Sequence, residues 1–250
     1  MAQQALPARD ARLGRPIGTV GADSPVGGVV LLLPGGEPES TRRGSPLLAT
    51  AAIRPLARRM VRAAGEDSLL AHVVHYRCRG WNGEAAHPVA DTTWAVDEVV
   101  RRYGDVPVCL AGMDMGARAA LRAAGHPAVS SVLALAPWLP EATEEPVEQL
   151  VGRQVLLAHG TDDRHTDPEL SYRLAERAKK INADVCRFEV HTDRHALRHR
   201  RPEVLELSMD FVLGTLCGRD FSRPLQDALA APPPLGLRMP LAAGFGQRPR

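Results

Sequence analysis

A short turn with a glycine at each end constrains this chain more than any other feature. Its sequence, at positions 112–116, is Gly-Met-Asp-Met-Gly, and it stands between an apolar run at 108–111 and an alanine-rich run that begins at Ala117. A strand can turn directly into a helix only if the residues two positions either side of the central one are small. The pentapeptide therefore predicts a strand–turn–helix unit, with Asp114 in a strained backbone conformation at its tip.

Predicted strands and helices alternate along the rest of the chain, which is typical of a mostly parallel sheet covered by helices on both faces. Apolar runs predict strands at 28–33, 69–76, 108–111, 131–136, 154–159 and 185–190. Helical spacing predicts helices at 47–64, where Pro55 should cause a kink, after Asp91 as an N-cap, after the turn, at 170–181, and at 202–216 as an amphipathic helix. The fold class expected is α/β.

The 250 residues are enough for one large domain. We expect that domain to span 26–218. Residues 1–25 are rich in Pro, Gly and Arg, which predicts a flexible N-terminal arm with a short edge strand near 17–20. Residues 219–250 contain three consecutive prolines and several glycines. They predict a Pro/Gly-rich C-terminal tail of irregular structure, either disordered or laid along the surface.

The composition gives no sign of a nucleic-acid or membrane partner. The net charge is only +2, and no apolar run is long enough to span a bilayer. The first residues lack the apolar core of a secretory signal. Cysteines 78, 109, 186 and 217 lack metal or disulfide spacing. We therefore expect a cytoplasmic protein with a small-molecule partner, without a metal or cofactor. The sequence leaves its oligomeric state open.

Polar segments follow three of the predicted strands. The first is Asp114, the second is His-Gly-Thr-Asp-Asp at 159–163, and the third is His-Thr-Asp-Arg-His at 191–195. Open α/β sheets bind ligands at the carboxyl ends of their strands, so these segments should converge at one edge. Asp163 and His195 are the preferred partners of Asp114. Other residues that compete for these two positions are Asp162, Asp167, His191 and His199.

Residues 28 to about 216 resemble the α/β-hydrolase superfamily. The turn has the form of the nucleophile elbow G-x-S-x-G, with aspartate in place of serine. The H-G-T-x-D segment resembles the one that bears the acid of the catalytic triad, which implies that role for Asp163. The segment ending at His195 resembles the one that bears the histidine. Pro-Gly-Gly at 34–36 resembles the oxyanion loop, which implies that the N–H groups of Gly36 and Met115 hold an oxyanion.

The aspartate elbow, followed by Ala-Arg, resembles those of haloalkane and haloacetate dehalogenases and of epoxide hydrolases, in which the aspartate is alkylated. Those enzymes carry a helical cap, for which the segment 137–153 is too short. The lidless body is more similar to small esterases or dienelactone hydrolases. Trp81 and Trp138 follow strands on the same side and are candidates for lining the pocket, although a buried packing role fits them equally well.

A carboxylate is ionised at pH 7 and needs no base to attack an activated carbon. Water must then cleave the resulting ester, with His195 as the base and Asp163 orienting it. We therefore expect a hydrolase of a small organic molecule with an Asp114–His195–Asp163 triad. Two alternatives remain open: a lyase or isomerase that uses Asp114 and His195 for proton transfer, and a catalytically silent homologue with a binding role.

Overall fold

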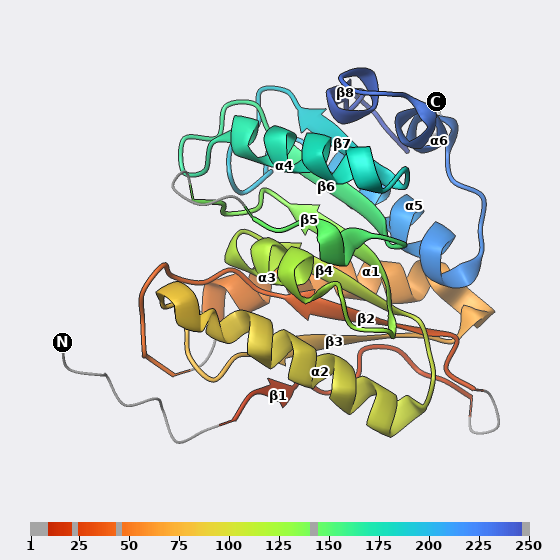
Figure 1. The fold of residues 1–250 in the computed structure, drawn as a ribbon. Coiled ribbons are helices and arrows are strands. Elements are labelled where there is room, and N and C mark those ends of the chain that lie inside the picture. The colour runs from red at the N-terminus through yellow and green to blue at the C-terminus, as the bar shows by residue number, and fades with distance from the viewer. Residues whose placement is uncertain (1–9, 22–24, 44–46, 141–144, 247–250) are drawn as a thin grey trace.

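The computed structural model describes residues 10–21, 25–43, 47–140 and 145–246. Their centre is an eight-stranded sheet in the order β1-β3-β2-β4-β5-β6-β7-β8 (Figure 1). Only β1 runs antiparallel to its neighbour, so the predicted mostly parallel sheet is confirmed. The strands are β1 Arg12–Leu13, β2 Gly28–Leu33, β3 Leu69–His75, β4 Val108–Met113, β5 Val129–Leu135, β6 Gln154–Gly160, β7 Val185–Val190 and β8 Met239–Pro240.

Helices cover both faces of the sheet. On one face lie α2 His87–Tyr103, α3 Met115–Ala123 and α4 Pro168–Ile181, and on the other lie α1 Leu47–Ala64, α5 Arg201–Cys217 and α6 Arg223–Ala230 (Figure 1). Side chains of a strand point alternately to the two faces. In β2, Val29 and Leu31 accordingly enter one apolar cluster and Val30 and Leu32 the other. A strand buried on both faces must be apolar throughout, and this continuous apolar run is why β2 could be predicted from the sequence.

One prediction about the helices is wrong in detail. Asp91 does not cap α2 but lies inside it, where its buried carboxylate accepts hydrogen bonds from the backbone N–H and the guanidinium of Arg77. The helix begins four residues earlier, at His87, with a proline in its first turn. Helix α1 runs through Pro55 without ending there.

Both ends of the chain contain more structure than their composition predicts. The N-terminal edge strand lies at 12–13 rather than 17–20, and Ile17 exchanges backbone hydrogen bonds with Ala71 of β3. In the C-terminal segment the expectation of irregular structure is wrong, because α6 and the short 3-10 helix η4 Leu235–Leu237 precede β8. Strand β8 then extends the sheet beside β7. The segments 1–9, 22–24 and 247–250 lie outside the described residues.

The C-terminal segment also explains why α5 is not amphipathic. Beyond its first two residues no side chain of α5 is fully exposed. Phe221 stacks on Phe211, and Ser222 donates to Asp210. Because the segment covers the outer side of the helix, α5 carries apolar residues on more than one face. The sequence prediction treated that side as facing water.

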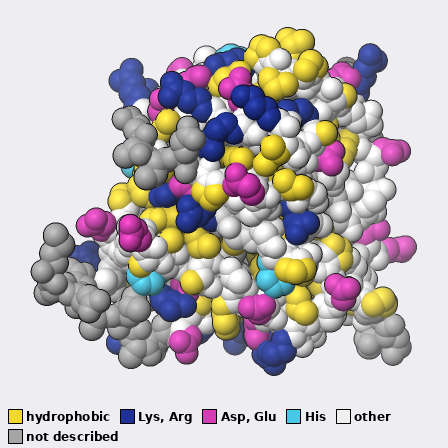
Figure 2. Space-filling model, in the orientation of Figure 1, with side chains coloured by type: hydrophobic (Ala, Val, Ile, Leu, Met, Phe, Trp, Pro, Cys, Tyr) yellow, Lys and Arg dark blue, Asp and Glu magenta, His cyan; other side chains and the backbone are white. Residues whose placement is uncertain are grey.

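The segment between β5 and β6 contains no cap among the residues described. Residues 137–140 and 145–153 include only the 3-10 helix η3 Glu148–Leu150. Within the described chain, no helix is long and apolar enough to cross a membrane. Basic and acidic side chains are interspersed over the face shown in Figure 2.

Candidate active site

The site is built around the turn between β4 and α3. Asp114 sits at its tip with φ 57° and ψ −125°, a conformation that costs free energy for any residue with a side chain. The flanking glycines make the turn sterically feasible. A Cβ atom on Gly112 would collide with the carbonyl oxygen of Gly116, and one on Gly116 would collide with the carbonyl oxygen of Leu33. Glycine is therefore required at positions 112 and 116 for the steric reason that the sequence suggested: a larger residue would prevent the turn from closing.

The fold brings Asp114, His195 and Asp163 together at the carboxyl ends of β4, β7 and β6. Nε2 of His195 lies 3.4 Å from Oδ1 of Asp114, and Nδ1 lies 2.9 Å from Oδ2 of Asp163. The side chain of Asp163 is fully buried, whereas those of Asp114 and His195 are 18% and 25% exposed. The imidazole thus bridges a buried carboxylate and one that a solute can reach.

The competing residues lie elsewhere. Asp167 caps α4 through the backbone N–H of Glu169, and Asp162 is exposed. His191 is exposed too, and His199 bonds through Nδ1 to the carbonyl oxygen of Thr192.

Asp163 is held by four groups besides His195. Its Oδ1 accepts hydrogen bonds from the backbone N–H groups of His165 and Thr166, at 2.8 and 3.1 Å. Its Oδ2 accepts from the Thr166 hydroxyl at 2.9 Å and faces Nε2 of the buried His159 at 3.1 Å. Burial alone would raise the pKa of Asp163, but these hydrogen bonds outweigh it and hold the pKa well below its usual value. Asp163 is therefore ionised and fixed in position.

His159 and His195 respond to their surroundings in opposite ways. Burial dominates at His159 and lowers its pKa, so the ring is neutral and supports Asp163 as a hydrogen-bond donor. Burial also lowers the pKa of His195, but the hydrogen bonds and negative charges of Asp114 and Asp163 outweigh it. The pKa of His195 is therefore raised above its usual value.

The loop after β2 lies directly against the turn. A Cβ atom on Gly35 would come within 2.7 Å of Oδ2 of Asp114, and one on Gly36 within 2.7 Å of the sulfur of Met115. Among the described residues, no group accepts a hydrogen bond from the backbone N–H of Gly36 or of Met115. Both N–H groups are thus without an acceptor among the described residues, in the loop and the turn that meet at Asp114.

An apolar cleft of about 560 Å³ adjoins the site. Met113 precedes Asp114 in the chain, and Ala196 and Leu197 follow His195, and all three line the cleft. The opposite wall comes from α1 and α5, through Ile53, Leu56, Val204 and Leu205. The lining includes none of Asp114, Asp163 and His195, so the cleft adjoins the site through the chain neighbours of Asp114 and His195.

Trp81 and Trp138 line a separate depression of about 590 Å³ together with Arg118. The Arg118 guanidinium lies 3.9 Å from the ring centroid of Trp81 and 4.9 Å from that of Trp138, and it pairs with the buried Glu145. The lining of this depression includes none of Asp114, Asp163 and His195. The packing of the two indole rings against Arg118 accounts for their positions.

Sequence reasoning missed His165, which lies two residues after Asp163 in the loop that follows β6. Its ring stands edge-on to that of His195, with the centroids 4.6 Å apart. A ligand atom of His165 lies within 4.8 Å of ligand atoms of Asp114 and His195. The one available signal was its place in the chain, because a residue two positions after Asp163 lies near the same edge of the sheet, but no sequence pattern marks it.

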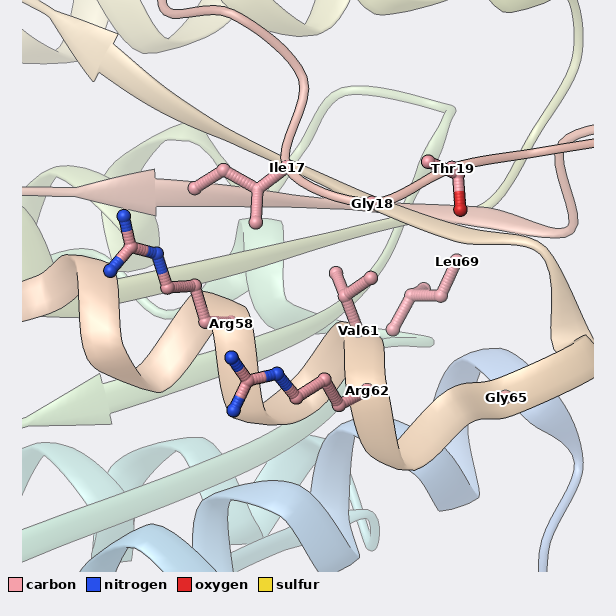
Figure 3. A pocket seen from close by; sticks show the side chains of 8 residues that line it. All are labelled: Ile17, Gly18, Thr19, Arg58, Val61, Arg62, Gly65 and Leu69. Carbon is pink, nitrogen blue, oxygen red and sulfur yellow. The ribbon is translucent and has the colours of Figure 1, made fainter.

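A further pocket, of about 390 Å³, lies far from this site in the fold (Figure 3). Its lining includes Gly65, just after α1, and Leu69, the first residue of β3. It therefore lies at the amino ends of the parallel strands, opposite the edge that carries Asp114.

No family model matches the sequence, and no curated protein matches it. The structure does resemble solved structures. The Pyrococcus furiosus esterase Pf2001 aligns with a TM-score of 0.62 and 15% identity, over 76% of this chain and 82% of that one. A putative α/β-hydrolase from Agrobacterium tumefaciens gives 0.57 and 14%, over 84% and 92%. Est1E from Butyrivibrio proteoclasticus, solved with ferulic acid bound, gives 0.56 and 14%, over 83% and 95%. The chain therefore has the α/β-hydrolase fold.

Proposed function

We propose that the protein is a hydrolase of small organic molecules that acts through a covalent ester of Asp114. The position of His195 carries the proposal, since one ring nitrogen faces Asp114 at 3.4 Å and the other faces Asp163 at 2.9 Å. A nucleophile on a strained turn, a histidine beside it and a buried acid behind the histidine are the parts that nucleophilic catalysis requires. Esterases among the structures that share the fold support hydrolytic chemistry.

The carboxylate of Asp114 favours attack at a saturated carbon. A tetrahedral adduct with an ordinary ester would expel the carboxylate, which is a much weaker base than an alkoxide. At a carbon that bears a halide, one Asp114 oxygen forms the new bond while the halide leaves with the bonding electron pair. At an epoxide, the ring oxygen takes that pair and receives a proton from the protonated imidazole of His195. Both routes leave a stable ester on Asp114.

Water then cleaves this ester. His195 takes a proton from the water through Nε2, and the oxygen attacks the carbonyl carbon of Asp114. The N–H groups of Gly36 and Met115 stabilise the oxyanion. Collapse breaks the bond to the product oxygen, which receives the proton from His195, and Asp114 is regenerated. Because the ester carries no charge, its formation lowers the pKa of His195 when a neutral base is needed.

The apolar cleft supports a substrate with a hydrocarbon part. Its walls are mostly apolar, and its volume of about 560 Å³ is in the range of small-molecule sites. Its lining includes Met113 and Ala196, the chain neighbours of Asp114 and His195. The substrate class favoured is therefore an apolar molecule with one activated carbon.

The raised pKa of His195 favours a second candidate function. A protonated imidazole next to a carboxylate is an acid–base pair, which a lyase or isomerase could use for proton transfer without a covalent intermediate. The two functions differ in whether Asp114 becomes esterified.

Trapping the ester tests the proposal. With His195→Gln, the first step should proceed and the second should stall, so the intact mass should rise by the alkyl group of a halide or by the whole mass of an epoxide. Peptide mapping should place the added mass on Asp114. The exposed His191→Gln is the matched control and should turn over without a stable adduct. If the wild type consumes a substrate of the panel and His195→Gln gains no mass, the ester mechanism is wrong and proton transfer is favoured.

A further inference from the structure

Three side chains of the kinds that bind metal ions lie close together at the solvent-accessible end of the site. Ligand atoms of Asp114, His165 and His195 all lie within 4.8 Å of one another. They come from the loops after β4, β6 and β7, which the parallel sheet brings to one edge. Across the described ranges, no other group of three His, Cys, Asp or Glu side chains converges in this way.

We propose that Asp114, His165 and His195 form a binding site for a single divalent transition-metal ion such as Zn²⁺. Two imidazole nitrogens and one carboxylate oxygen suit zinc and its neighbours in the first transition row, not the all-oxygen shells that Mg²⁺ and Ca²⁺ prefer. Three protein ligands leave a fourth position open to solvent.

One of the ligand–ligand distances already matches that of a tetrahedral zinc site. Zinc bonds of about 2.0–2.1 Å place two ligands of a tetrahedron roughly 3.4 Å apart. The separation between Nε2 of His195 and Oδ1 of Asp114 is 3.4 Å. The ligand atom of His165 lies within 4.8 Å of the other two, and its exposed side chain is free to adjust to the ion.

The surroundings of His195 fit a metal ligand as well. Nδ1 of the ring is bound to the buried Asp163, which leaves Nε2 for the ion. A histidine held in this way by a carboxylate is the usual outer-shell arrangement of protein metal sites. The same Asp163 accepts the backbone N–H of His165, so it positions the loops of both histidines.

Metal binding would oppose the covalent reaction. The ion would occupy the carboxylate that attacks and the nitrogen that accepts the proton, so the metal-bound form should be inactive. This consequence rests on the proposed hydrolase function. The site itself does not, since it depends only on the three side chains.

The experiment uses the full chain without a polyhistidine tag, stripped with EDTA and dialysed. Zn²⁺ is titrated by calorimetry, and Co²⁺ is followed by its visible absorption. We expect one ion per chain in the wild type and at least about tenfold weaker binding in His165→Ala. The control His191→Ala, an exposed histidine outside the cluster, should bind like the wild type. Circular dichroism confirms that each variant is folded.

The proposal is overturned if the wild type binds neither ion, or if His165→Ala binds as tightly as the wild type. Hydrolysis in EDTA separates the two proposals. If a substrate is found, Zn²⁺ should inhibit the wild type, and His165→Ala, measured relative to its own rate in EDTA, should lose that inhibition. If no substrate is turned over, the hydrolase proposal fails, while the titrations still decide the metal site.

Discussion

One carboxylate oxygen of Asp163 lies 2.9 Å from Nδ1 of His195. Because Asp163 is ionised, it accepts a hydrogen bond from the Nδ1–H of His195, and this bond fixes the orientation of the ring. Nε2 then points at Asp114, at the solvent-accessible end of the site. His159 and Thr166 hold Asp163 from behind, so the position of the ring is set by residues that no solute reaches.

Replacing Asp163 by Asn should abolish most of the activity. The amide cannot take the same set of hydrogen bonds from His195, His159 and Thr166, and it no longer stabilises a charged imidazole. In a serine protease triad the corresponding change costs about 10⁴-fold in kcat. We expect a loss of about 10³- to 10⁴-fold in the hydrolysis step, measured in a single turnover as the decay of the ester. The exposed Asp162→Asn is the control, and equal rates for the two variants would contradict the assignment.

Replacing Asp114 by Asn should lower the pKa of His195, because Asp114 provides the largest contribution that raises it. NMR titration of the ring protons measures the change, and Asp105→Asn, before β4 at the opposite edge of the sheet, is the control.

The raised pKa of His195 also determines how the stability of the protein changes with pH. A raised folded-state pKa stabilises the protein below the unfolded pKa of about 6.5, and this contribution is lost as the pH rises through the folded pKa. In Asp114→Asn the contribution of His195 to the pH dependence of the free energy of unfolding should be smaller. An unchanged pKa would mean that the two side chains do not interact in solution.

Much of this site was predictable because it depends on short local patterns. The glycines of the turn, the H-G-T-x-D segment and the final histidine each follow a buried strand, and the parallel sheet brings their ends together. His165 was missed because an exposed loop histidine has no pattern of its own. The outer face of α5 was misjudged because its cover, including Phe221, comes from the segment that follows the helix, whose prolines predicted irregular structure.

Replacing Asp114 by Ser should create activity on an activated aryl ester. Serine is the usual residue of such a turn, and a hydroxyl there would be close to Nε2 of His195 and to the N–H groups of Gly36 and Met115. Release of nitrophenolate from nitrophenyl acetate measures it, with Asp114→Ala as the matched control. A folded serine variant no faster than the alanine variant would indicate that the histidine and the oxyanion donors are not aligned, which favours a silent homologue with a binding role.

Replacing Glu145 by Gln should destabilise the fold without removing a group of the triad. Arg118 is 8% exposed and Glu145 4% exposed, so the change leaves a buried guanidinium without its carboxylate. Breaking a buried pair in this way costs about 3–5 kcal/mol. The rings of Trp81 and Trp138 still contact the cation, which places the expected loss near the lower end of that range. Urea unfolding measures it, with the exposed Glu66→Gln as the control. A loss no larger than that of the control would show that the indole rings alone stabilise Arg118, since the charge of Glu145 would then contribute nothing measurable.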